Sequence, residues 1–189
     1  FNITRDHTTG TIAANTAGGT DTFTVGGNLA YGSGANGGTL AVTLNGIGTQ
    51  NLSQTSGTTQ PSGVLKINKS SGSVTQTTNI TLNNANLDVT QGTFDQVGFS
   101  TGGISVFFLR NLARWRSTTP GTLTATTWMN YLGCVHELYG SGNMNFNWTT
   151  NCDLYFNKNG GNYVQLSGNT STNGNLLIIS GSLRGLSYP

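Results

Sequence analysis

Two cysteines, one histidine and one aspartate come closest to a chemical site in this sequence. Cys134 and His136 are two positions apart, which places both side chains on one face of a strand, and Cys152 and Asp153 begin another strand. Four such ligands could bind zinc, but structural zinc sites usually contain paired C-x-x-C motifs, which this chain lacks. The sequence therefore favours a Cys134–Cys152 disulfide, or two buried thiols, over a metal site.

Other catalytic groups are scarce. The chain has 6 acidic residues and 2 histidines. A hydrolase needs paired carboxylates, or a nucleophile beside a positioned base. Asp88 and Asp95 flank one predicted turn and could face each other, but such residues more often cap turns by accepting backbone N–H groups. The sequence predicts a protein that is not an enzyme and that holds no cofactor.

A G-x-G-x-x-G pattern runs from Gly32 to Gly37. In a dinucleotide site this loop opens a helix whose N-terminus holds the pyrophosphate. Here the pattern leads into GTLAVTL (residues 38–44), which reads as a strand. In a chain with 28 glycines, a chance match is the better explanation.

The only basic cluster is RNLARWR, which contains Arg110, Arg114, Trp115 and Arg116. Arginine forks and a stacking ring could contact nucleic acid or an acidic neighbour. A solvated loop after a buried strand is the simpler interpretation. Three charges are few for packaging a genome, so we favour an intersubunit ion pair or a plain loop, and nucleic acid is an unlikely partner.

Alternation of apolar and polar side chains is the strongest structural signal. Short alternating runs rich in Thr, Val and aromatic residues are separated by Gly, Asn and Ser clusters. This pattern predicts many short strands and little or no helix. Two runs, ISVFFL (104–109) and LLII (176–179), carry apolar residues on both faces, which predicts central strands buried on both sides. The predicted strands are 22–25, 40–44, 64–67, 74–82, 94–99, 104–109, 123–128, 131–139, 143–148, 152–156, 163–166 and 176–179.

We expect an all-β fold, namely a jelly-roll-like β-sandwich, because many short strands with hairpin-like turns are typical of that class. No internal repeat stands out. Large side chains concentrate late in the chain, so residues 61–189 are expected to form the sandwich core. Residues 1–60 would form edge strands, or an arm that pairs with another subunit. The expected core has one set of side chains from each of two strands: Ile104, Val106 and Phe108, with Met144, Phe146 and Trp148.

Charged residues make up only 7% of the chain, and the net charge is +2. Such a low charge gives little electrostatic repulsion between copies of the protein, which favours self-association. It also gives no long-range attraction for nucleic acid or an acidic membrane surface. No apolar run is long enough to predict a membrane span.

The segment from Leu65 to Leu112 (LKINKSSGSVTQTTNITLNNANLDVTQGTFDQVGFSTGGISVFFLRNL) resembles small β-sandwich proteins of bacteriophage particles. In those proteins a polar strand pair leads through a glycine turn into an apolar strand that ends in a similar FLRNL-like segment. The resemblance covers about a quarter of the chain. It ends at Leu112, where an acidic strand would be expected and Ala113-Arg-Trp-Arg116 stands instead. It implies a role in a virion and brings no catalytic residue.

These observations predict a structural subunit of a virion (capsid, decoration, spike or tail component) that acts by self-assembly, in a virion or at an extracellular surface. Its partners would be copies of itself or other particle proteins. One alternative is an extracellular glycan-binding adhesin or carbohydrate-binding module, with a host surface glycan as its partner. Another is a cell-surface filament subunit joined by strand donation.

Overall fold

The computed structural model describes residues 3–5, 22–32, 39–58, 60–118, 123–146, 149–166 and 171–185. Within these ranges the protein is all-β and contains no helix. The strands are not arranged as a sandwich. They form a parallel β-solenoid of about 7 turns, in which every pair of neighbouring strands runs in the same direction. The expected β-sandwich or jelly roll is therefore wrong.

Eighteen strands are described. In chain order they are β1 (Ile3–Arg5), β2 (Thr22–Val25), β3 (Leu29–Tyr31), β4 (Ala41–Leu44), β5 (Gln50–Gln54), β6 (Leu65–Gln76), β7 (Ile80–Asp95), β8 (Thr101–Leu109), β9 (Ala113–Ser117), β10 (Leu123–Asn130), β11 (Val135–Gly140), β12 (Met144–Phe146), β13 (Thr149–Thr150), β14 (Asp153–Lys158), β15 (Tyr163–Leu166), β16 (Ser171–Thr172), β17 (Leu176–Ser180) and β18 (Ser182–Arg184).

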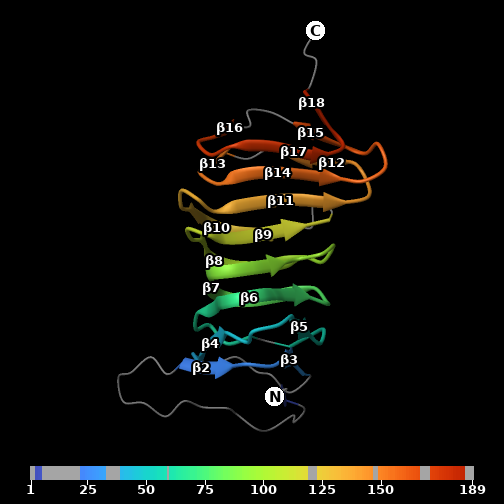
Figure 1. Ribbon diagram of the computed structural model, residues 1–189. Helices are drawn as coiled ribbons and strands as arrows, with labels where there is room; N and C mark the ends of the chain where they lie inside the picture. The colour runs from blue at the N-terminus through green and yellow to red at the C-terminus, as the bar shows by residue number, and fades with distance from the viewer. Residues whose placement is uncertain are drawn as a thin grey trace.

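Successive turns of the chain lie directly on one another, and the colours of Figure 1 run in order along the stack from the blue N-terminal end to the red C-terminal end. One long ladder follows the order β1-β3-β5-β6-β7-β9-β11-β14-β17. A second ladder joins β2, β4, the start of β6, the middle of β7, β8 and β10. Two short ladders, β12-β15-β18 and β13-β16, complete the C-terminal turns. Side-chain hydrogen bonds between neighbouring turns join residues 19 to 27 positions apart.

The interior is filled by the alternate residues of each strand. In the first long ladder Val74, Phe94, Trp115 and His136 occupy equivalent positions on neighbouring strands, and all four are buried. Because side chains on a strand alternate between faces, one inward set per turn builds a continuous apolar column. Equivalent inward positions therefore recur in every turn, but the residue types at these positions differ. This explains why no internal repeat is visible in the sequence.

The inward-pointing residues of strand β8 differ from those expected in the core. Ile104 is buried, but Phe107 and Leu109 point inward in place of Val106 and Phe108, which are only half-buried. The pairing of β7 with β8 shifts register between Ala85 and Leu87, and a one-residue shift exchanges the two faces of a strand. The side chains of Met144 and Phe146, and Trp148 as a whole, lie outside the described part of the structure.

The LLII run also differs from expectation. It forms most of β17, the last strand of the first long ladder, and its four apolar side chains are 45% to 52% exposed. Within the described residues β17 has a paired neighbour on one side only, which is β14. Its apolar character therefore does not mean that it is buried twice.

The described strands before residue 60 belong to the same stack. Strand β2 pairs with β4, which pairs in turn with β6, and Val25, Leu44 and Leu52 belong to the same buried cluster as Trp115. Residues 1–60 were predicted to form edge strands or an assembly arm. Their described part contains β1 to β5, and β1 pairs with β3 of its own chain, whereas residues 6–21 and 33–38 lie outside the described ranges.

Candidate functional site

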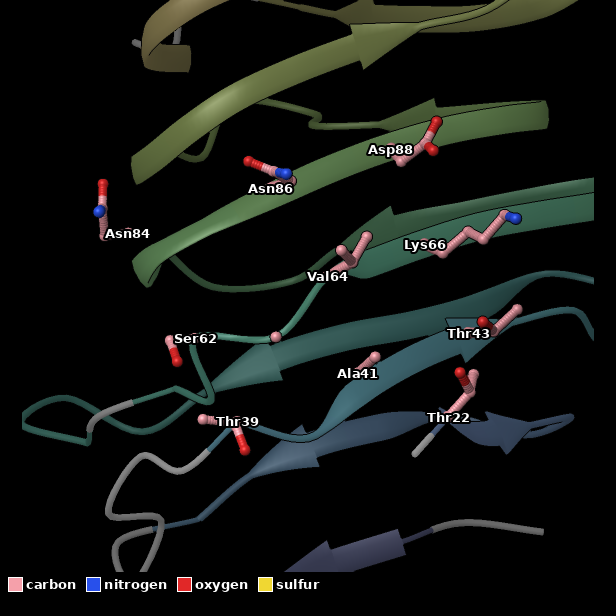
Figure 2. A pocket seen from close by; sticks show the side chains of 11 residues that line it. Thr22, Thr39, Ala41, Thr43, Ser62, Val64, Lys66, Asn84, Asn86 and Asp88 are labelled. Carbon is pink, nitrogen blue, oxygen red and sulfur yellow. The ribbon is translucent and has the colours of Figure 1, made fainter. Parts of the chain in front are cut away.

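A groove crosses the outer face of the second ladder near its N-terminal end, and we call it the lateral groove. Its volume is about 450 Å³. Figure 2 shows its lining side chains projecting from successive strands of the stack. Most are hydroxyl or amide groups, with one lysine and one aspartate. The lining residues are Thr22, Thr39, Ala41, Thr43, Ser62, Gly63, Val64, Lys66, Asn84, Asn86 and Asp88.

The strand register explains how the groove forms. Thr43, Lys66 and Asp88 are direct partners on β4, β6 and β7, and each lies beside inward residues that are buried, so all three point outward in one row. Beside this row the side chains of Ala41 and Val64 are short, and the hollow lies over them (Figure 2). Neighbouring parallel strands are about 4.8 Å apart, so the row offers one polar group at each such step.

The charge in the groove is unbalanced. Asp88 accepts two hydrogen bonds from Arg110, from Nε at 2.7 Å and from Nη2 at 2.9 Å. This bidentate contact with Asp88 raises the pKa of Arg110 above its usual value. Lys66, in contrast, forms no ion pair within the described ranges. The net charge contributed by these three side chains is positive.

Two asparagines form one wall. The side-chain oxygen of Asn86 accepts the backbone N–H of Val106 at 3.2 Å, which orients its carboxamide. Asn84 is exposed and has a φ of 53°, a left-handed conformation that asparagine tolerates better than most residues.

Aromatic side chains adjoin the groove on the turns above Asp88. The Arg110 guanidinium lies 4.9 Å from the centre of the Phe108 ring and 5.3 Å from that of Tyr131. Tyr131 is 42% exposed. The lining of the groove ends at Asp88, and Arg110 connects Asp88 to this accessible ring outside the lining.

The predicted basic cluster divides between the two ladders. Arg110 borders the lateral groove, whereas Arg114 and Arg116 lie on the outer face of the first ladder. There both arginines reach the Glu137 carboxylate, at 3.2 Å from Arg114 and 3.4 Å from Arg116. Arg116 also lies 3.6 Å from Asp95. These ion pairs join neighbouring turns of one chain.

Trp115 lies in the interior, where its indole N–H donates to Gln96 at 3.1 Å. It therefore cannot stack on a base at the surface. Its two flanking arginines point outward because alternate residues of β9 face opposite sides.

The cysteine and histidine cluster is internal. Cys134 and Cys152 form a disulfide between adjacent turns. His136 is buried, with its ring 5.2 Å from Trp115 and 6.4 Å from Trp128, and burial lowers its pKa to about 3. Asp153 faces outward and accepts the backbone N–H of Asn175 at 2.7 Å. Within the described ranges no group of three or more His, Cys, Asp or Glu side chains is placed to hold a metal ion.

The two aspartates considered as a catalytic pair have separate partners. Asp88 binds Arg110 in the second ladder. Asp95 accepts the Tyr139 hydroxyl at 2.8 Å and the backbone N–H of Val97 at 3.0 Å in the first ladder. Most of the G-x-G-x-x-G pattern (residues 33–37) lies outside the described residues.

A second unusual surface lies at the C-terminal end of the stack. Leu176, Leu177, Ile178 and Ile179 of β17 form it, and we call it the C-terminal edge. A small cavity of about 80 Å³ opens beside it, lined mainly by apolar side chains: Leu154, Phe156, Leu166, Ser171, Thr172, Leu176 and Leu183.

The sequence alone indicated neither surface. The groove residues belong to different predicted strands and to the segments between them, and only parallel stacking brings them together. The LLII run was recognised as apolar, but its place at the end of the ladder was not.

No protein-family model matches the chain, and no curated protein or solved structure matches it either. In the described part of the chain there is no helix with the length and apolar character needed to cross a membrane.

Proposed function

We propose that this chain is a non-catalytic structural protein of an extracellular or particle surface, and that it acts by associating end to end with copies of itself. The observation that carries the proposal is the C-terminal edge. Solenoid proteins normally need a polar terminal repeat to stay soluble, because each repeat covers the core of the next. Here the last strand of the long ladder exposes four aliphatic side chains.

The edge also lacks the usual protection against strand pairing. Natural edge strands carry lysine, proline or inward-pointing charges that prevent a second strand from adding. Strand β17 is LLIIS, with no charged residue and no proline. Among the described strands only β14 pairs with it, so its other side offers backbone hydrogen-bonding groups and apolar contact to another strand.

The proposed location is supported by the disulfide. Cys134 and Cys152 are paired, and disulfides persist mainly in oxidising compartments outside the cytosol. The virion setting stays a prediction from the sequence.

The test is sedimentation velocity of the intact chain over a range of concentrations, with electron microscopy of the associated fraction. We expect multimers whose share rises with concentration. The double variant Leu177→Lys/Ile179→Lys should sediment as a monomer, because two charges would have to be buried at the joint. Ile47→Lys is the control, since Ile47 is 80% exposed but lies between β4 and β5, and these strands are far from β17 in the stack (Figure 1).

Circular dichroism should show the same β content in all three proteins. A wild-type chain that stays monomeric at high concentration would refute the proposal. So would a double variant that associates as the wild type does.

A further inference from the structure

The polar row of the lateral groove runs across the strands and not along one of them. Thr43, Lys66 and Asp88 stand on three successive turns, and Thr22 lies one turn below, beside Ala41. A ligand that contacts the whole row must therefore be extended and must offer a polar group at each turn of about 4.8 Å. Successive sugars of an extended polysaccharide repeat at a similar length.

The lining chemistry matches sugar hydroxyls. Threonine and serine hydroxyls donate and accept hydrogen bonds, and the amides of Asn84 and Asn86 do both at different atoms. The short side chains of Ala41 and Val64 leave room for the ring of a sugar and contact its C–H groups. An apolar ligand would leave these hydroxyls and amides without partners, which costs free energy.

The charge selects among sugars. Lys66 is the unbalanced cation of the groove, because Arg110 already neutralises Asp88 with two hydrogen bonds. A carboxylate on the ligand would give Lys66 an ion-paired hydrogen bond. With a single such cation and a chain net charge of +2, the groove is a poor match for the dense phosphates of nucleic acid.

Tyr131 offers a stacking surface outside the groove lining, next to the Arg110–Asp88 ion pair. Tyr131 is held in place by the Arg110 guanidinium, 5.3 Å from the ring centre, and is 42% exposed. Aromatic rings present an apolar face with a polar edge, which suits the C–H face of a pyranose.

We propose that the lateral groove binds an extended acidic polysaccharide, with a sugar carboxylate at Lys66, hydroxyls along Thr22, Thr43 and Asn86, and a sugar ring on Tyr131. This inference is independent of end-to-end association, since the groove and the C-terminal edge lie toward opposite ends of the stack (Figure 1).

The test is isothermal titration calorimetry with two probes of equal length: an oligomannuronate, which carries one carboxylate per sugar, and a neutral cello-oligosaccharide. The protein used carries Leu177→Lys/Ile179→Lys if the wild type associates, so that failure of the two proposals can be told apart. We expect the acidic probe to bind more tightly, and Lys66→Gln to weaken its binding about tenfold.

Two further variants keep the result unambiguous. Arg184→Gln also removes one exposed positive charge, but it lies on β18 away from the groove, and it should leave binding unchanged. Ala41→Phe changes no charge and fills the hollow, so it should abolish binding while the melting temperature reports that the fold is retained. Absence of binding by the acidic probe would overturn the proposal. Equal affinity for the neutral probe, or an equal loss in Arg184→Gln, would do the same.

Discussion

Acidification should destabilise this protein through one buried imidazole, that of His136. His136 is 1% exposed, and its pKa is lowered from 6.5 to about 3 by burial. The unfolded chain therefore binds a proton on this residue below about pH 6.5, whereas the folded chain stays neutral down to about pH 3. Stability is intact above this window and is lost progressively as the pH falls through it.

The size of the effect follows from the difference in proton binding. Between about pH 8 and pH 5 the folded protein should lose about 2 kcal/mol of unfolding free energy from His136 alone. This loss is a sizeable share of the unfolding free energy of a folded domain, which is usually about 5–15 kcal/mol. For a chain of this size it corresponds to a fall in melting temperature of roughly 4–8 °C.

Urea unfolding followed by circular dichroism, at several pH values and with the disulfide intact, measures this loss. His136→Leu removes the titrating group and keeps a side chain of similar bulk between Trp115 and Trp128. We expect the unfolding free energy of the variant to change less with pH, by about 2 kcal/mol over the same interval. The carboxylates are common to both proteins, so the difference between the two pH profiles isolates His136. Parallel pH profiles for the wild type and His136→Leu would show that the imidazole is not kept neutral by burial.

Two further substitutions test how adjacent turns are held. Lys158 is buried, and its ammonium donates hydrogen bonds to the carbonyl oxygens of Thr118 at 3.0 Å and Tyr139 at 2.9 Å. Lys158→Met removes both bonds and should therefore lower the unfolding free energy, measured in urea, by about 2–4 kcal/mol. Lys66→Met in the outward row is its control and should stay within about 0.5 kcal/mol, while equal effects would argue against a structural role for Lys158. Gly103 has a φ of 65°, and an added Cβ would overlap the carbonyl oxygen of Leu82, so Gly103→Ala should lower stability by more than about 2 kcal/mol. Gly26→Ala meets no atom within 4 Å and serves as its control; a harmless Gly103→Ala would mean that the two turns approach less closely than described.

The groove and the C-terminal edge show why a site on a solenoid is hard to read from one sequence. Thr43, Lys66 and Asp88 are each separated by about a full turn of chain, and nothing local links them. Tyr131 lies still further along the sequence. Their common row exists only because each turn stacks on the previous one, so the signal lies in the register and not in any short motif.

Composition and local pattern were enough to determine the all-β class. Threonine, valine and aromatic residues in alternating runs favour strands, and the described residues contain no helix. The pairing direction was not determined, because a strand that alternates apolar and polar residues has the same pattern in a parallel and in an antiparallel ladder. The Gly, Asn and Ser clusters taken as hairpin turns are instead the corners at which each turn of the solenoid bends.

The inward face of β8 was likewise decided by tertiary structure. Ile104 was correctly placed in the core, but the register shift between β7 and β8 then exchanged Val106 and Phe108 for Phe107 and Leu109. The LLII run of β17 was apolar by sequence, yet only its position at the end of the ladder exposes it. Local sequence thus determined that these residues form strands. Which neighbour each strand meets, and which face that neighbour covers, was decided by contacts between residues a full turn apart.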